Sequence, residues 1–283
     1  MRILPKVELV KKIKCPVCGS EMELSVERGA SLLCKGVKRH CYDISSAGYV
    51  NLMPPGYSGS GDSKAAVRAR RDFLSLELYR PAAATLADIL DERLPKNAFV
   101  IDAGCGEGYY TSIIAERGFL TAGADISKFA TEAATKRTAA KGLDNAFFTV
   151  GSVFDLPFFD SSADCIVNIF APCAEEEFCR VLKTGGILAV VYAGPEHLMG
   201  LKHTIYDTAK ENDGRADMPK NMKLLEERRV CFDIDVRGNE NILNLFSMTP
   251  YYWRTSQTDS EKLCGLDTLT TAIDMVIAVY EKE

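Results

Sequence analysis

The sequence predicts an α/β fold with a parallel, doubly wound sheet, preceded by a small cysteine-rich module. Three observations support this: apolar runs alternate with helical segments, a glycine-rich turn follows the first apolar run, and four cysteines stand within the first 41 residues. Such alternation favours helices on both faces of a parallel sheet. The expected strands lie near 98–103, 120–125, 146–150, 163–170 and 186–193, with helices at 109–117, 127–141 and 174–183.

The flanking parts of the chain divide into a module, an approach and a C-terminal extension of the sheet. We expect a module over 1–53, a linker and helical approach over 54–95, and the α/β domain over 96–283. Residues 54–62 are rich in turn formers, and a helix should begin after Ser63 or Asp62 as its cap. The remaining expected elements are helices over 82–94 and 196–211 and strands at about 229–237 and 270–281.

The segment from Asp102 to Gly108 is a glycine-rich turn between a buried strand and a helix. It reads Asp-Ala-Gly-Cys-Gly-Glu-Gly, and glycine allows close approach of a ligand or a positive φ. A dinucleotide fingerprint needs its third glycine where Tyr109 stands, and it has no acidic start. The pattern instead resembles motif I of the class I S-adenosylmethionine-dependent methyltransferases, which implies a Rossmann-like sheet. The expected cofactor contacts in this turn are Asp102, Gly104, Gly106, Glu107 and Gly108.

Asp125 ends the second predicted strand and is our candidate ligand for the cofactor ribose. In nucleotide-binding folds an acidic residue about 20 positions after the turn accepts the ribose hydroxyls. The competing interpretation is that the glycines only make a tight turn and that Asp125 caps the helix beginning at Ser127. The spacing of the two features together favours cofactor binding.

The first four cysteines have the spacing of a zinc site. Cys15 and Cys18 are separated by two residues, and Cys34 follows after fifteen intervening residues, close to His40 and Cys41. Two tight turns that each offer two ligands suit tetrahedral zinc. The fourth ligand is either His40 or Cys41, because these neighbours cannot easily bind together. A redox pair is the alternative for Cys15 and Cys18, but no βαβ pattern surrounds them. Four protein ligands predict a structural zinc site.

Charge is unevenly distributed along the chain. Residues 1–80 hold fourteen Lys and Arg against eight Asp and Glu, whereas the whole chain of 283 residues has a net charge of −5. A local basic patch can attract phosphates, although a solvated surface is the simpler explanation for any one cation. No apolar run approaches the roughly 20 residues of a membrane span, and the N-terminus lacks a signal-peptide core, so we expect a cytoplasmic protein. The candidate RNA contacts are Lys35, Lys38, Arg39, Arg68, Arg70 and Arg71.

Several strings outside the generic motifs resemble the bacterial 23S ribosomal RNA guanine-N1-methyltransferases. The resemblance spans nearly the whole chain after the first dozen residues. The strings are Cys15-x-x-Cys18, Cys34 with Arg39-His40, Asp43, Gly48-Tyr-Val-Asn-Leu52, Arg70-Arg71-x-Phe73-Leu74, Tyr79-x-Pro81, the glycine turn with Tyr109 and Tyr110, Ala171-Pro172-Cys173, Gly194-Pro195-x-His197-Leu198-Met199 and Met248-Thr249-Pro250.

This resemblance implies an N-terminal zinc-binding RNA-recognition module on a class I methyltransferase domain. It implies methyl transfer to N1 of one guanine in a hairpin of domain II of 23S rRNA, and pairing of two subunits around the RNA. By the same resemblance Cys15, Cys18, Cys34 and His40 hold zinc and leave Cys41 beside them. Five residues separate Cys34 from His40, a longer second turn than in the family, so Cys41 stays an alternative to His40.

The resemblance also assigns cofactor contacts beyond the turn. It points to Tyr79 and His197, whereas fold position places Ser152 and Val153 beside the adenine. Tyr79 can instead be a core aromatic residue, and His197 can cap the helix that follows it.

The end of the fourth strand is the expected position of the target base. Phe170 could stack on the guanine and the Ala171 carbonyl could accept its N1 or amino proton, although Phe170 could equally pack beneath the loop. The target base must leave its stack, because a base pair hides N1. Two other functions stay open: a small-molecule methyltransferase with a zinc interaction module, and an RNA-binding protein without catalysis.

Overall fold

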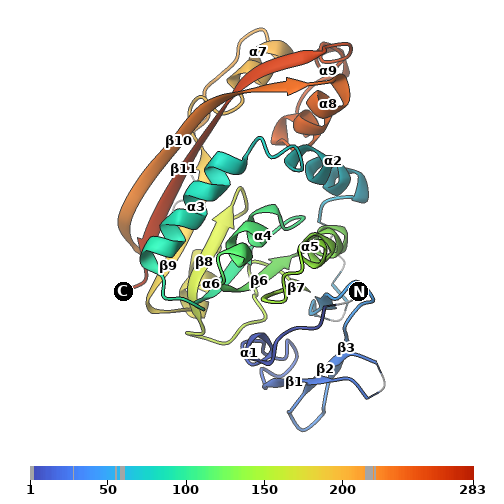
Figure 1. Cartoon of the computed structure of the whole chain (residues 1–283), viewed down its shortest axis with the longest axis vertical. Helices are drawn as coiled ribbons and strands as arrows, with labels where there is room; N and C mark the ends of the chain where they lie inside the picture. The colour runs from blue at the N-terminus through green and yellow to red at the C-terminus, as the bar shows by residue number, and fades with distance from the viewer. Residues whose placement is uncertain (1–2, 28, 55, 58–60, 214–218, 220) are drawn as a thin grey trace.

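A central eight-stranded sheet organises the protein, as a computed structural model shows (Figure 1). The structure describes residues 3–27, 29–54, 56, 57, 61–213, 219 and 221–283. In spatial order the strands are β10 (Lys223–Arg237), β11 (Thr268–Glu281), β9 (Leu182–Ala193), β8 (Ala163–Ile169), β5 (Phe99–Ala103), β6 (Leu120–Asp125), β7 (Ala146–Val150) and β4 (Val50–Asn51).

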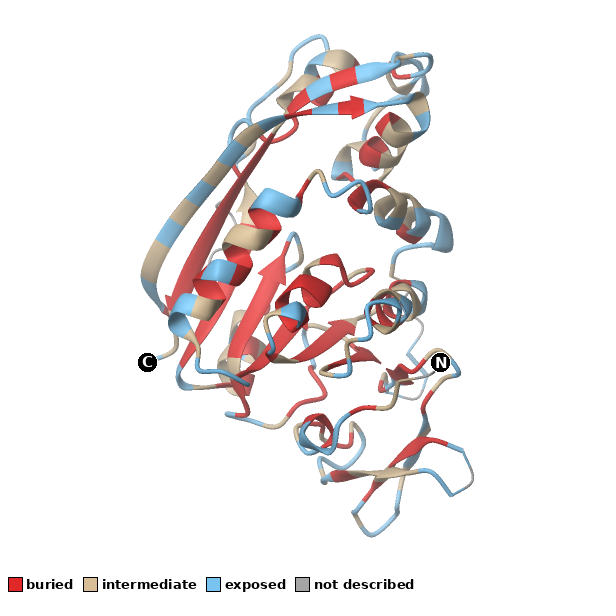
Figure 2. Ribbon diagram, in the orientation of Figure 1, coloured by how far each residue is buried: buried red, intermediate tan, exposed pale blue. Residues whose placement is uncertain are grey.

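The six strands from β9 to β4 run parallel, which confirms the predicted fold class. Successive side chains of β5 serve opposite faces: Val100 joins the core under one set of helices, and Ile101 joins the other core. The first face carries α3 (Arg80–Arg93), α4 (Tyr109–Glu116) and α5 (Lys128–Ala140), whereas α6 (Glu175–Val181) covers the second. Both faces of the central parallel strands are therefore buried (Figure 2).

The other edge of the sheet is a long antiparallel pair, β10 and β11, with β11 next to β9. Between these two strands the chain forms α8 (Asn239–Ser247), η1 (Pro250–Trp253) and α9 (Gln257–Glu261), none of which the sequence predicted. The expected helix over 196–211 is wrong in length, because α7 covers only Met199–Ile205. Asn212 folds back instead and donates its side-chain amide to the carbonyls of Gly194 and His197 at 3.2 and 2.9 Å.

The N-terminal module contains α1 (Val7–Val10) and a small antiparallel sheet of β1 (Met22–Ser25), β2 (Ser31–Cys34) and β3 (Cys41–Asp43). We call this small sheet with its turns the ribbon. Leu9 and Ile13 pack in the core at the amino end of β5, beside Phe99 and Phe158. Two residues of the predicted module, Val50 and Asn51, form β4 and extend the main sheet. In Figure 1 the ribbon lies at the lower end of the molecule, far from α8 and α9.

Helix α2 (Lys64–Leu74) stands between the ribbon and the α/β domain in sequence and packs against α8 and α5. Its cap is Ser63, whose hydroxyl accepts the Ala66 N–H at 3.2 Å. This helix therefore joins the C-terminal segment to the glycine-turn side of the sheet. In the described part of the chain, no helix has the length and apolar character needed to cross a membrane.

Candidate functional site

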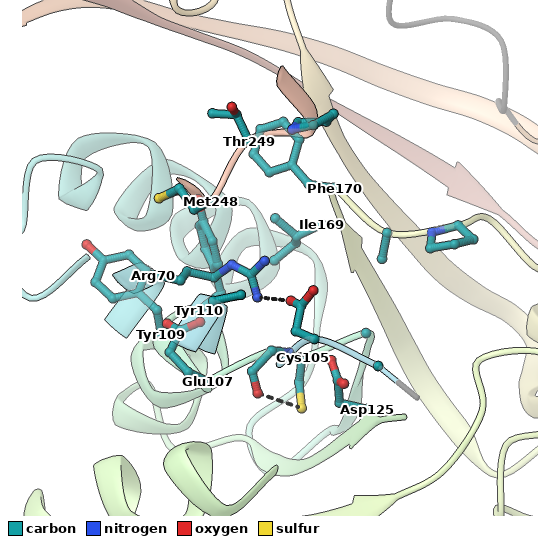
Figure 3. A pocket seen from close by; sticks show the side chains of 18 of the residues that line it. Arg70, Cys105, Glu107, Tyr109, Tyr110, Asp125, Ile169, Phe170, Met248 and Thr249 are labelled. Carbon is teal, nitrogen blue, oxygen red and sulfur yellow. Dashed lines mark hydrogen bonds and ion pairs between the residues drawn. The ribbon is translucent and has the colours of Figure 1, made fainter. Parts of the chain in front are cut away.

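A pocket of about 820 Å³ opens at the carboxyl ends of β5, β6 and β8. Ligands of open parallel sheets bind at this edge. The turn after β5 and the ends of β6 and β8 form one side of the pocket. Residues of α2 and of the segment 247–254 complete it from distant parts of the sequence (Figure 3).

The glycines of the turn serve different purposes. Gly104 has φ +83°, and a Cβ there would lie 2.6 Å from the Ala171 Cβ, so a side chain would collide with the end of β8. Gly106 has φ +54°, and the nearest atom to a Cβ there is the Arg70 Nη1 at 3.7 Å. The backbone at Gly106 thus faces the pocket. Gly108 does not line the pocket, because it packs against Ala134 of α5 at the start of α4.

Asp102 is a buried carboxylate at the pocket floor. Its Oδ2 accepts the Thr111 hydroxyl, whereas its Oδ1 has no hydrogen-bond partner among the described residues. Burial raises the pKa of Asp102 to about 7, helped by the like charges of Asp125 and Glu107 and opposed by the Thr111 hydrogen bond. A buried carboxylate oxygen without a partner is costly unless a ligand completes it, and an ammonium group would do so.

Asp125 ends β6 and clamps two backbone segments. Its Oδ2 accepts the Gly106 N–H at 2.9 Å, and its Oδ1 accepts the Ser127 N–H at 2.7 Å. Burial raises the pKa of Asp125, and these two backbone hydrogen bonds oppose the shift. The structure thus brings Asp125 to the turn, as the ribose hypothesis requires, and also to the start of α5, as the capping alternative requires. Ser127 itself caps α5 by accepting the Ala130 N–H.

Glu107 is buried at the back of the turn. Its Oε1 lies 3.7 Å from the Arg137 Nη2, and burial raises the pKa of Glu107 against the opposing charges of Arg137 and Arg70. Arg137 also stacks over the Tyr109 ring, 5.5 Å from its centroid. This buried pair holds the turn against α5 and α4.

His197 and Tyr79 meet in the pocket wall, edge to face, with ring centroids 6.1 Å apart. The His197 Nδ1 accepts the Asp274 N–H at 3.2 Å, and burial lowers the His197 pKa to about 4. His197 is therefore neutral near pH 7 and carries its proton on Nε2. The hydroxyl of Tyr79 is buried with no hydrogen-bond partner among the described residues. Both residues line the pocket.

Phe170 stands at the end of β8 with a left-handed backbone, φ +50°, and half of it is exposed. Its ring stacks on His197 at a centroid distance of 5.5 Å and an angle of 28°. The Asn168 amide donates to the carbonyls of Ala103 and Pro172, each at 3.2 Å, which fixes this loop to the end of β5. Phe170 is thus held in an unusual conformation facing the pocket rather than packed beneath the loop.

Several pocket residues were not predicted as cofactor or substrate contacts. Ser152 and Val153 line the pocket as expected, but the exposed Phe154 beside them was missed. The wall formed by 247–254 was not predicted either, although the family resemblance includes Met248-Thr249-Pro250. It includes Trp253, which is 77% exposed.

The basic residues of α2 separate into two groups. Arg68 and Arg71 are exposed and pair with Asp72 at 3.5 and 2.7 Å. Arg70 instead lines the pocket and pairs with Asp62 at 2.6 Å. The structure therefore places Arg70 with the cofactor candidates and not with the surface cations.

The four candidate zinc ligands come together in the ribbon. Cys15, Cys18, Cys34 and His40 offer ligand atoms that all lie within 4.8 Å of one another, a set that suits a tetrahedral Zn²⁺ ion. Cys41 is exposed and begins β3 outside this cluster, which favours His40 as the fourth ligand. Gly36 donates its N–H to the Cys34 Sγ at 3.2 Å, and a Cβ at Gly36 would collide with the neighbouring turn.

Two of the three predicted RNA contacts on the ribbon already have acidic partners. Lys35 pairs with Glu21 at 3.2 Å, and Arg39 pairs with Glu23 at 2.8 Å. Lys38 forms no ion pair with a described residue. The ribbon surface is therefore less basic than the sequence alone suggested.

The fold and the site together define a class I methyltransferase that carries a zinc ribbon. A family model described as a methyltransferase domain matches residues 94–248, and one described as the N-terminal part of RlmA, a zinc ribbon, matches residues 13–57. S-adenosylmethionine and zinc are the cofactors of this class, and the glycine turn and the Cys/His cluster fit them.

Named relatives narrow the class to one family. A Micromonospora griseorubida protein, named provisionally as a 23S rRNA (guanine-N1)-methyltransferase, is 28% identical over 88% of this chain and 89% of its own. A Bacillus subtilis protein with the same provisional name is 29% identical over 68% of each chain. The 23S rRNA (guanine(748)-N1)-methyltransferase of Streptomyces fradiae is 31% identical over 68% of this chain and 67% of its own. The chain belongs to the family of 23S rRNA (guanine-N1)-methyltransferases with an N-terminal zinc ribbon.

Proposed function

We propose that this protein methylates N1 of one guanine in a hairpin of domain II of 23S rRNA. Family membership supports the RNA substrate, and one structural observation supports binding of an unpaired base in the pocket. Three exposed aromatic side chains line the pocket: Phe154, Phe170 and Trp253, which are 64%, 50% and 77% exposed. Flat exposed rings around a cofactor pocket suit an unpaired base, since aromatic side chains stack on bases of any sequence.

Different pocket residues then bind different parts of the cofactor. S-adenosylmethionine supplies a methyl group on a sulfonium, and transfer depends chiefly on orienting this group toward the base. Asp102 binds the ammonium of the methionine part, with its unpartnered Oδ1 as the acceptor. Asp125 accepts the ribose hydroxyls, and Ser152 and Val153 flank the adenine. The backbone at Gly106 lies against the ligand.

On the substrate side, Phe170 stacks on the guanine and the Ala171 carbonyl accepts the hydrogen bond of N1–H or of the amino group. N1 forms a bond to the methyl carbon as the bond from that carbon to sulfur breaks, and the N1 proton passes to water. His197 supports the Phe170 ring from behind. Its low pKa keeps it neutral, so it adds no positive charge next to the sulfonium.

The ribbon is the second RNA contact in this proposal. Its cations are Lys35, Lys38 and Arg39, with Arg68 and Arg71 of α2 nearer the pocket. Since the ribbon and the C-terminal helices lie at opposite ends of one chain, a homodimer would be a natural way to present both to one RNA hairpin.

The reaction is tested by methyl incorporation from labelled cofactor into 23S rRNA of cells that lack this protein. We expect label in one guanine, mapped by mass spectrometry to N1 and absent from RNA that the protein has already modified. Phe170→Ala should lose this incorporation, while Phe170→Tyr, which keeps an aromatic ring, should retain most of it. Label that enters a metabolite extract and not RNA would support a small-molecule methyltransferase instead.

Stacking at the pocket can be followed directly, because Trp253 is the only tryptophan in the chain. It lies beside Tyr252, with ring centroids 5.0 Å apart, and Tyr252 packs on the buried Phe246. An RNA hairpin with the target guanine should quench Trp253 fluorescence in the presence of S-adenosylhomocysteine, the form of the cofactor that has lost its methyl group. The same hairpin closed into a full duplex is the control, and equal quenching by both would contradict base stacking.

A further inference from the structure

Arg70 is the pocket residue whose position departs most from its predicted role. Its guanidinium lies over the glycine turn, where Nη1 is 3.7 Å from the position of a Cβ on Gly106 (Figure 3). Three-quarters of its side chain is buried, in contrast to the exposed Arg71 that follows it on α2. The Arg70 guanidinium therefore lies in the pocket, apart from the exposed cations Arg68 and Arg71.

The charges around Arg70 are almost all negative. The pocket is lined by four carboxylates, Asp62, Asp102, Glu107 and Asp125. Burial raises the pKa of Glu107 and of Asp125, and the Arg70 charge opposes both shifts. Such a pocket suits the ammonium and the sulfonium of S-adenosylmethionine, but it would repel the carboxylate of the same molecule. The cofactor carboxylate therefore needs a cation near the turn.

We propose that Arg70 binds the carboxylate of S-adenosylmethionine, while Asp62 holds the guanidinium in place. Asp62 accepts from Nη1 at 2.6 Å, and the remaining N–H groups of Arg70 have no hydrogen bond to a described residue. A guanidinium has five N–H donors in a planar fork, so it can serve two carboxylates at once. Asp62 follows Gly61, which packs tightly on Ile126 and Ser127 beside Asp125, and this fixes the anchor.

Arg254 is the other arginine among the described residues that line the pocket. It ends the wall formed by 247–254, beside the exposed Trp253, and unlike Arg70 it has no atom within 4 Å of a Cβ on Gly106. We assign it to the RNA side of the pocket. Replacing Arg70 should therefore change the preference for intact over decarboxylated cofactor, whereas replacing Arg254 should not.

The test compares S-adenosylmethionine with its decarboxylated form, which keeps the ammonium, the sulfonium and the nucleoside. Calorimetry on the full chain without RNA should show wild type binding the intact cofactor about 10- to 100-fold more tightly, the usual value of a charge-assisted hydrogen bond. In Arg70→Gln this ratio should fall to nearly one, because only the intact cofactor loses a partner. Arg70→Lys should recover part of the ratio, since the charge remains without the fork.

Three controls keep the result interpretable. Arg71→Gln and Arg254→Gln should leave the ratio of the two affinities at the wild-type value. Equal weakening of both ligands by Arg70→Gln, or a collapse of the ratio in Arg254→Gln, would overturn the assignment of Arg70. The assignment rests on the proposed cofactor pocket, which Asp125→Ala tests separately: that variant should weaken both ligands, and no effect on either would remove the pocket itself. Thermal unfolding confirms that each variant is folded.

Discussion

We predict that Asp102 makes the affinity for S-adenosylmethionine depend on pH between about 6 and 8. Its pKa is about 7 because burial penalises the charged form. Only the ionised carboxylate can pair with the cofactor ammonium, so the apparent affinity falls in proportion to the ionised fraction. With a pKa near 7, that fraction drops from about nine-tenths at pH 8 to about one-tenth at pH 6, and affinity should fall about tenfold.

The assay is calorimetry of cofactor binding at pH 6, 7 and 8 in buffers of different ionisation enthalpy. At pH 6 binding should release nearly one proton, because the carboxyl must ionise. At pH 8 the carboxyl releases almost none, and the cofactor amino group, which is then partly neutral, takes up a proton on binding. Asp102→Asn should bind weakly at every pH without this dependence. The His197 pKa of about 4 lies below the range, so His197 contributes nothing to it.

Thr111→Val is the matched second variant. This substitution removes the Thr111 hydroxyl, whose hydrogen bond lowers the Asp102 pKa. The decrease in affinity should therefore begin at a higher pH than in wild type. Constant wild-type affinity between pH 6 and 8, or the same dependence in Asp102→Asn, would refute the pairing of Asp102 with the ammonium. If Asp102→Asn keeps the wild-type dependence, Glu107 or Asp125, whose pKa values burial also raises, is the group to examine.

Three further predictions concern zinc, the turn and the ribbon surface. Cys15→Ser should unfold residues 14–50, since small modules of this kind depend on their metal, while cofactor affinity survives; stoichiometric zinc and full RNA methylation would contradict it. Asp125→Ala should weaken cofactor binding by about 1.5–3 kcal/mol and Gly106→Val by more, measured by calorimetry on folded variants, and unchanged affinity in both would exclude the turn from the site. Replacing the three ribbon cations, Lys35, Lys38 and Arg39, with alanine should weaken RNA binding and lower its salt dependence without changing cofactor affinity.

The sequence predicted five of the six parallel strands, because each of those five contains a short apolar run buried on both faces, but it missed β4, whose two residues were assigned to the N-terminal module. The same reasoning found only the second part of β10, at about 229–237, because charged residues such as Glu226 and Arg228 interrupt the apolar pattern before it. That strand lies at the edge of the sheet and is covered on one face only, so its run over Lys223–Arg237 depends on pairing with β11. The short helices α8, η1 and α9 depend likewise on tertiary contacts, which local patterns do not reveal.

In the candidate site, the spacing of residues in the sequence predicted those that lie in one turn and the adjacent strand. It missed residues that are distant in sequence and reach the pocket only in the folded chain. Asp102, Gly106 and Asp125 lie in a turn and at the end of the adjacent strand, so their proximity follows from the βαβ pattern. Arg70 and Trp253 reach the same pocket from α2 and from beyond β10. Nothing in the local sequence distinguishes Arg70 from Arg71, because only the orientation of the helix decides which one is buried.

The ion pairs on the ribbon determine how much the salt dependence of RNA binding should change when Lys35, Lys38 and Arg39 are all replaced with alanine. Each phosphate contact removed lowers the salt-dependence slope by roughly one unit, so three free cations would lower it by about three. Lys35 and Arg39 are held by Glu21 and Glu23, and moving either cation to a phosphate would leave a carboxylate close to the RNA. We therefore expect Lys38→Ala alone to reproduce most of the change in slope. A change shared equally among the three single variants would mean that the glutamate pairs open on RNA binding, whereas no change in the triple variant would move the RNA contact to Arg68 and Arg71.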